Sequence, residues 1–195
     1  MPAVTALPEW MYAPRIEGWH ADDLDHLLEA PPHTEMLHGA FVFRLFPPPA
    51  GNDRLVDALA HALTGQAPAG VEIARETAIR LDTRNRFESD LLATAVAHDP
   101  SRTFFTPEQV LLVVEVVSPE SAYRDRMVKP RKYAEAGVAH YWRVEEEDSS
   151  PVVHAYELDE PTRQYVPTGI HSGELHTTRP FEITLDLNGL GRPRR

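Results

Sequence analysis

The chain has 195 residues, of which 42% are hydrophobic, enough for one domain with its own core. Its formal net charge of -11 argues against a protein that coats nucleic acid nonspecifically, because such binding depends on lysine and arginine contacts to phosphate. The absence of cysteine excludes zinc fingers, thiolate nucleophiles and disulfide scaffolds, and it agrees with a reducing compartment.

Neither a secretory signal nor a membrane span is expected. The chain contains no run of about 18 apolar residues, and its first 20 residues lack the basic region and apolar stretch of a signal peptide. We therefore expect a cytoplasmic protein that does not contact a membrane.

The first third of the chain predicts an arm, a short helix, a strand and a longer helix. Residues 1–18 contain three prolines and no periodicity, so they predict an N-terminal arm. Residues 20–32 carry leucines at helical spacing and end at paired prolines, which predicts a short helix. Residues 34–49 predict a strand that starts near Glu35, is broken by Gly39 and is ended by three prolines.

Residues 53–65 predict an amphipathic helix that ends at Gly65. Its apolar side chains share one face: Leu55, Val56, Leu59, Ala60 and Leu63.

From residue 71 the pattern predicts three strands, at residues 71–81, 86–96 and 110–118. The third is apolar on both faces, as is typical of a central strand covered on both sides by helices. A helix then runs to Ala136 with Gly137 as its cap. Because Pro130 is tolerated only in a first turn, the regular part of this helix starts near Arg126 or later.

The last quarter predicts another strand at residues 140–148, followed by antiparallel hairpin strands within residues 151–169 and 180–187. The expected fold class is mixed α/β (α+β), with a central mixed β-sheet flanked by helices and C-terminal antiparallel hairpin strands. One domain spans residues 19–190, between the arm and a C-terminal tail at residues 191–195.

Glu115 is the most informative residue, because it lies inside the apolar run of residues 110–117. Burying a lone carboxylate costs several kcal/mol, so Glu115 needs a partner such as a metal ion or a lysine. Asp90 lies on the preceding predicted strand and would come beside Glu115 if the two strands are neighbours. Two carboxylates with water and a phosphate suffice to hold Mg²⁺, and Lys129 on the next helix could orient a water or offset phosphate charge.

Simpler interpretations stay open for each residue. Glu115 could form a buried ion pair with an arginine, and Asp90 could cap a strand or accept backbone hydrogen bonds. Glu35 could be a solvated residue at the start of its strand. Lys129 could pair with Asp125, four residues earlier on the helix.

Positive side chains also cluster in this region, at Arg124, Arg126, Lys129, Arg131 and Lys132. They form either a basic face around an acidic metal site or an ordinary solvated helix face. The aromatic residues that follow, Tyr133, Tyr141 and Trp142, are expected to pack the helix against the sheet.

Three segments, SDLLATAV (89–96), LLVVEVVSPES (111–121) and RDRMVKPRKYAEAGVAHYWRVE (124–145), resemble the Uma-type restriction-endonuclease-like domain, a branch of the PD-(D/E)XK nuclease superfamily. The shared pattern is a strand ending EV-x-S-P, an Asp and a Lys four residues apart, a Tyr four further on, a Gly and a YW pair. TEMLHGAFV (34–42) is similar to the family's Glu-x-x-x-Gly strand. The resemblance covers roughly residues 20 to 187.

This resemblance implies a metal-dependent phosphodiesterase site that acts on DNA with Mg²⁺ or Mn²⁺. Asp90 would be the shared metal ligand, Glu115 the second ligand and Glu35 an auxiliary acid, with Lys129 as the motif lysine. The chain departs from the usual motif in three places. Ser89 precedes Asp90 where the motif has proline, Val117 stands where the E-x-K lysine would be, and Asn52 replaces a frequent histidine. Lys132 could compete with Lys129 for the lysine role.

The leading expectation is therefore a metal-dependent DNA endonuclease. The alternative is a catalytically inactive nuclease-fold module with a binding or regulatory role, as the missing E-x-K lysine and the acidic composition suggest. A third interpretation is an enzyme that acts on a small phosphodiester. Nucleases of this fold that cut two strands suggest a homodimer by analogy, and the sequence leaves the oligomeric state open.

Overall fold

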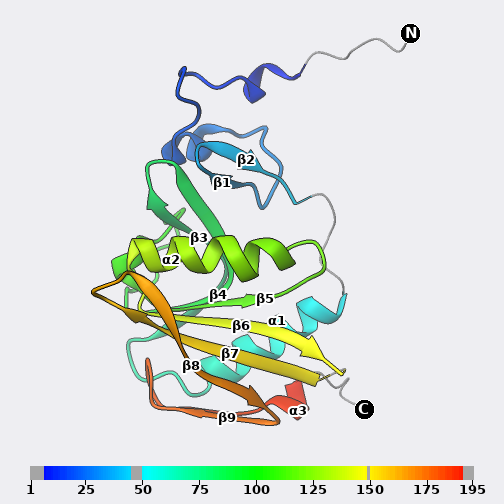
Figure 1. The fold of residues 1–195 in the computed structure, drawn as a ribbon. Helices are drawn as coiled ribbons and strands as arrows, with labels where there is room; N and C mark the ends of the chain where they lie inside the picture. Colours follow the sequence, from blue (N-terminus) through cyan, green and yellow to red (C-terminus); the bar gives the residue numbers. More distant parts are fainter. Residues whose placement is uncertain (1–6, 45–49, 149, 191–195) are drawn as a thin grey trace.

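The computed structural model describes residues 7–44, 50–148 and 150–190 (Figure 1). Within these residues, eight strands form one sheet in the order β2-β1-β4-β5-β6-β7-β8, with β3 also paired to β4. The strands are β1 (Glu35–Leu37), β2 (Ala40–Val42), β3 (Glu72–Asp82), β4 (Asn85–Thr94), β5 (Val110–Val116), β6 (His140–Glu147), β7 (Ser150–Asp159) and β8 (Gln164–Ser172).

The sheet is mixed, as predicted. Strands β5 and β6 pair in parallel, with Val113 opposite Tyr141, and the other pairs in this sheet are antiparallel. A parallel pair needs a long crossover, and here the crossover contains the helical segment η4 (Arg124–Val128) and helix α2 (Lys129–Ala136). The parallel pair thus places the start of α2 beside the end of β5.

The predicted central strand, β5, lies between β4 and β6 and is covered on both faces. Helix α1 (Ala50–Thr64) packs on one face with its predicted apolar residues, all of which are buried. On β5, Leu112 and Val114 face α1, whereas Val113 packs with Tyr133 of α2 on the other side. Because side chains alternate along a strand, Glu115 shares the α2 side with Val113.

The crossover helix changes its winding before Pro130. Ala122 and Tyr123 are helical, the next five residues form a π-helical turn, and the regular α-helix starts at Lys129. Pro130 lacks an N–H group and its ring would clash with a carbonyl of the preceding α-helical turn. The wider π-helical turn accommodates this proline, so the predicted start of the regular helix, near Arg126 or later, is confirmed.

The N-terminal region packs against the β1–β2 hairpin. Residues 20–32, predicted as a short helix, contain the 3₁₀ helix η2 (Ala21–His26), which follows a shorter one, η1 (Glu9–Met11). The ring of Trp10 lies 6.3 Å from that of Phe41.

The break predicted at Gly39 is the turn of the hairpin. The three prolines after Phe46 and the tail at 191–195 lie outside the described residues, and the domain limits stay predictions.

The C-terminal region forms a second, two-stranded sheet from β9 (Glu174–Thr177) and β10 (Ile183–Asp186), followed by α3 (Leu187–Leu190). The strand predicted within residues 180–187 contains β10, but its partner β9 was not predicted. Strand β9 has four residues, of which only Leu175 is buried, so its apolar pattern is too short to recognise. In the described part of the chain, no helix is long and apolar enough to span a membrane.

Gly137 ends α2 in the left-handed conformation, with a φ of 96°, and its N–H donates to the carbonyls of Tyr133 and Ala134. Gly137→Ala should therefore lower the free energy of unfolding by at least about 1 kcal/mol, because a Cβ strains this conformation. The matched control is Gly51→Ala in α1, where a new methyl group meets nothing within 4 Å and should be neutral or slightly stabilising. Urea unfolding of the wild type and both variants measures these free energies. An equal change for Gly137→Ala and Gly51→Ala would contradict the role given to Gly137.

Candidate active site

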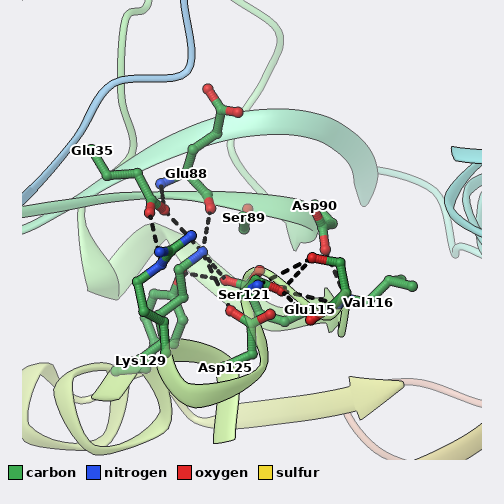
Figure 2. A network of polar contacts seen from close by, with 12 residues as sticks. Glu35, Glu88, Ser89, Asp90, Glu115, Val116, Ser121, Asp125 and Lys129 are labelled. Atoms are coloured by element: carbon green, nitrogen blue, oxygen red, sulfur yellow. Dashed lines mark hydrogen bonds and ion pairs between the residues drawn. The ribbon is translucent and has the colours of Figure 1, made fainter. Parts of the chain in front are cut away.

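The ammonium group of Lys129 is enclosed by oxygen atoms from three strands and from η4, the turn before its own helix (Figure 2). Its Nζ lies 2.9 Å from Oε1 of Glu35 on β1 and 3.1 Å from Oε1 of Glu115 on β5. It also donates to the backbone carbonyl of Glu88 on β4, at 2.9 Å. Only 8% of the Lys129 side chain is exposed. Its ammonium group donates hydrogen bonds to Glu88 and Glu115 and forms an ion pair with Glu35, so the buried charge is compensated.

Asp90 and Glu115 are brought together by the pairing of β4 with β5. Leu91 lies opposite Val114 in this antiparallel pair, so Asp90 and Glu115 are the next residues along the two strands. Oδ2 of Asp90 accepts the backbone N–H of Val116 at 2.7 Å. Glu115 is 2% exposed and accepts the hydroxyl of Tyr133 at Oε1, at 2.8 Å. The sequence-based expectation that these acids lie side by side agrees with this geometry.

Glu35 is fixed to the same site from the edge of the sheet. Its Oε1 accepts the backbone N–H of Glu88 at 3.0 Å as well as contacting Lys129. All four predicted residues line one cavity of about 60 Å³, which has room for a few water molecules. Arg124, Asp125 and Ser121, from the turn before α2, line the same cavity.

The cavity carries more carboxylates than its buried cation can neutralise. Burial raises the pKa of Glu115 well above its usual value and raises that of Asp90 to about 6. Burial alone would lower the pKa of Lys129, but the charges of Glu115, Glu35 and Asp125 raise it well above the usual value. Lys129 therefore stays charged, whereas the acids are held in a site that favours an additional cation or a proton.

Some of the simpler interpretations of Glu115, Asp90 and Lys129 also describe contacts that the structure contains. The cation beside Glu115 is Lys129 rather than an arginine. Lys129 lies 3.9 Å from Oδ1 of Asp125, so the helix pair exists but is the longest of its ion pairs. Asp90 does accept a backbone hydrogen bond. Lys132, the competing lysine, pairs with Glu135 at 3.0 Å and does not line the cavity.

Two residues that contact the site were not predicted to do so. Tyr133 was expected only to pack, and it does pack edge-on against Phe87, yet its hydroxyl also holds Glu115. Tyr133 follows Lys129 by four residues, so helical spacing was a usable signal that both face the same strand. Asn52 donates to the backbone carbonyls of Val116 and Val117, at 3.4 and 3.2 Å. The family resemblance singled out this position, where a histidine is frequent, but it did not indicate this contact.

The carboxylate oxygens of Asp90 and Glu115 suit a hard divalent cation that keeps part of its water shell. Among the described residues, the hydrogen bonds to Asp90 use only Oδ2 and those to Glu115 use only Oε1, which leaves one oxygen on each carboxylate. The same residues contain no group of three or more acidic, histidine or cysteine side chains arranged to hold a metal. Mg²⁺ needs only one or two carboxylates besides water and substrate oxygens, so Asp90 and Glu115 suffice.

Comparison with known proteins identifies the family. Residues 21–188 match the family model Uma2, described as "Putative restriction endonuclease", and the chain therefore belongs to this family. The structure is similar to the crystal structure of a "putative nuclease belonging to DUF820" from Anabaena variabilis, with a TM-score of 0.59 and 11% sequence identity. The similarity covers 80% of this chain and 88% of that one, and it shows the fold. No curated protein sequence matches the chain significantly.

The raised pKa of Asp90 makes a prediction about stability in the absence of divalent cations. Unfolded Asp90 ionises near pH 3.8 and folded Asp90 near pH 6, so the folded state binds the proton more tightly between these values. The stability contributed by protonated Asp90 is present below about pH 4 and is lost as the pH rises through 6. Relative to Asp90→Asn, the wild type should lose about 2 kcal/mol of unfolding free energy between pH 4 and pH 7.

Urea unfolding of both proteins at several pH values, with a chelator present, measures this difference. Because the charge of Asp90 raises the pKa of Glu115, the difference reports the coupled titration of this pair, whereas acids that do not interact with Asp90 titrate alike in both proteins. Parallel pH profiles for the wild type and Asp90→Asn would contradict the assignment.

Proposed function

We propose that this member of the nuclease family is a Mg²⁺- or Mn²⁺-dependent DNA endonuclease that hydrolyses phosphodiester bonds at the Lys129 cavity. The observation that carries the proposal is the convergence of Glu35, Glu115 and Lys129, with Asp90 on the adjacent strand. Family membership supports the class of reaction.

Each residue has a role that follows from its contacts. A cation held by Asp90 and Glu115 would polarise a phosphate oxygen and lower the pKa of a bound water. Lys129 provides a fixed positive charge beside the two ligands and offsets the negative charge that develops on the phosphate. Glu35 holds Lys129 by an ion pair, and we regard it as a positioning residue.

Arg124 is suited to contact the phosphate as it enters. It lines the cavity, and its Nε, buried in the described structure, has no hydrogen-bond partner there. The nearest carboxylate oxygen, Oε2 of Glu35, is 4.0 Å from this nitrogen. A guanidinium that keeps free donors can bind a phosphate through two parallel hydrogen bonds.

Metal binding is the first test of the proposal. Calorimetric titration of the wild type with Mn²⁺ should give one binding event that disappears in Asp90→Ala and in Glu115→Ala. Cleavage of supercoiled plasmid DNA with Mg²⁺ or Mn²⁺ should disappear with it. The same weak isotherm for the wild type and both variants would overturn the metal site.

The two lysines provide a matched comparison for the catalytic step. Lys129→Ala should abolish DNA cleavage, whereas Lys132→Ala, one turn further along α2 and outside the cavity, should leave the cleavage rate within about twofold of the wild type. Removing a buried ion-pair partner also costs about 3 to 5 kcal/mol, so circular dichroism must first show that Lys129→Ala is folded. Equal cleavage by the two variants would exclude Lys129 from the reaction.

One observation favours the alternative, a nuclease-fold module without turnover. Lys129 is already held by two hydrogen bonds and by its ion pair with Glu35, and Val117 occupies the usual place of the motif lysine. Such a module would bind DNA and Mn²⁺ but cleave no plasmid, branched DNA or small phosphodiester under any metal condition. For either function we expect a homodimer by analogy with other nucleases of this fold, which sedimentation analysis would test.

A further inference from the structure

We propose that a second cavity, on the outer side of α2, binds a nucleobase that carries a phosphate, either in an unpaired nucleic-acid strand or in a free nucleotide. Its volume is about 700 Å³, within the range of small-molecule sites. It lies between α2 and strands β7 and β8, and α2 contacts β8 directly (Figure 1).

This cavity is distinct from the Lys129 cavity. The two share no lining residue in the described chain. Lys129 and Tyr133 point from α2 toward the sheet, whereas Met127, Pro130 and Arg131 line the second cavity. Of the five positive residues that cluster in the sequence, Arg124 and Lys129 line the first cavity, Arg126 and Arg131 line the second, and Lys132 lines neither.

One wall of the second cavity is aromatic and held in place. Tyr165 stacks on the buried Tyr141, with ring centres 5.5 Å apart and an angle of 15° between the planes. The Tyr165 hydroxyl donates to the carbonyl of Val138 at 2.9 Å, which fixes the ring. Tyr156 lies beside both rings, and the guanidinium of Arg143 is 5.8 Å from its centre. Aromatic rings next to guanidinium groups are surfaces on which nucleobases stack.

The cavity is lined by four arginines whose acidic partners are partly shared. Arg126 and Arg143 both pair with Glu145, and Arg131 shares Glu135 with Lys132. The remaining arginine, Arg163, pairs with Glu160 at 3.4 Å and is about half exposed. Cations thus outnumber carboxylates here, on a chain whose net charge is -11. This local excess fits a phosphate group, to which arginine binds with planar, paired donors.

Two exposed residues that line this cavity suit the two parts of such a ligand, Met127 the base and Arg131 the phosphate. Met127, in the π-helical turn η4 that precedes α2, is 62% exposed. The flexible thioether of Met127, in the same cavity as the tyrosines, can contact the edge of a base without selecting one particular base. The Arg131 side chain is 78% exposed, so it can turn toward a phosphate without loss of a buried contact.

The test uses the full chain in EDTA, so that binding is measured without metal and without cleavage. Fluorescence anisotropy with a labelled single-stranded oligonucleotide at low salt should show saturable binding. Arg131→Glu and Arg163→Glu should each weaken it at least fivefold. Arg54→Glu, an exposed arginine on α1 that lines neither cavity, makes the same charge change and should leave affinity within twofold.

Two further arms separate stacking from charge attraction. Tyr156→Ala should weaken binding whereas Tyr156→Phe should not, and an abasic oligonucleotide should bind the wild type more weakly than the normal one. Competition by AMP or ATP would show that a free nucleotide occupies the site, and binding of the oligonucleotide alone would assign it to a strand.

Because the assay contains EDTA and measures neither metal binding nor cleavage, this proposal and the nuclease proposal can fail separately. No binding by the wild type would overturn the second site. Equal losses in Arg131→Glu and Arg54→Glu, or equal affinity for normal and abasic strands, would also overturn it.

Discussion

The buried ammonium of Lys129 is the interaction on which this structure depends. It joins Glu35 of β1, Glu115 of β5 and the backbone of β4 at one point inside the protein. Each of these buried charges would be costly alone, and the group is tolerable only because the opposite charges meet at hydrogen-bonding distance. The carboxylates that compensate the charge of Lys129 outnumber it, so the cavity around Lys129 keeps an excess of negative charge.

The backbone explains how Lys129 reaches this position. The parallel pairing of β5 with β6 requires a crossover, and the crossover returns the chain directly over the end of β5. A π-helical turn precedes Pro130 and sets the rotation at which the regular helix begins. Lysine therefore comes from the helix, whereas the E-x-K pattern would place it on the strand where Val117 stands.

The spacing of apolar residues was sufficient to predict the helices and strands that bury many side chains in the core. The apolar face of α1 and the two-sided burial of β5 are examples, because each is encoded locally. The contact of Glu35 with Lys129 joins residues 94 positions apart. The place of Glu35 at the start of a strand and the family resemblance pointed to this residue, but neither predicted its contact with Lys129. Strand β9 and the contact of Asn52 with the end of β5 depend on tertiary packing. A linear pattern does not contain them.

The most direct measurement of the central claim is anomalous diffraction from crystals grown with Mn²⁺. The account predicts one Mn²⁺ ion bound by oxygen atoms of both Asp90 and Glu115, at about 2 Å, with Lys129 still paired to Glu35. Well-ordered Asp90 and Glu115 side chains with no Mn²⁺ between them, in crystals grown with excess Mn²⁺, would contradict it.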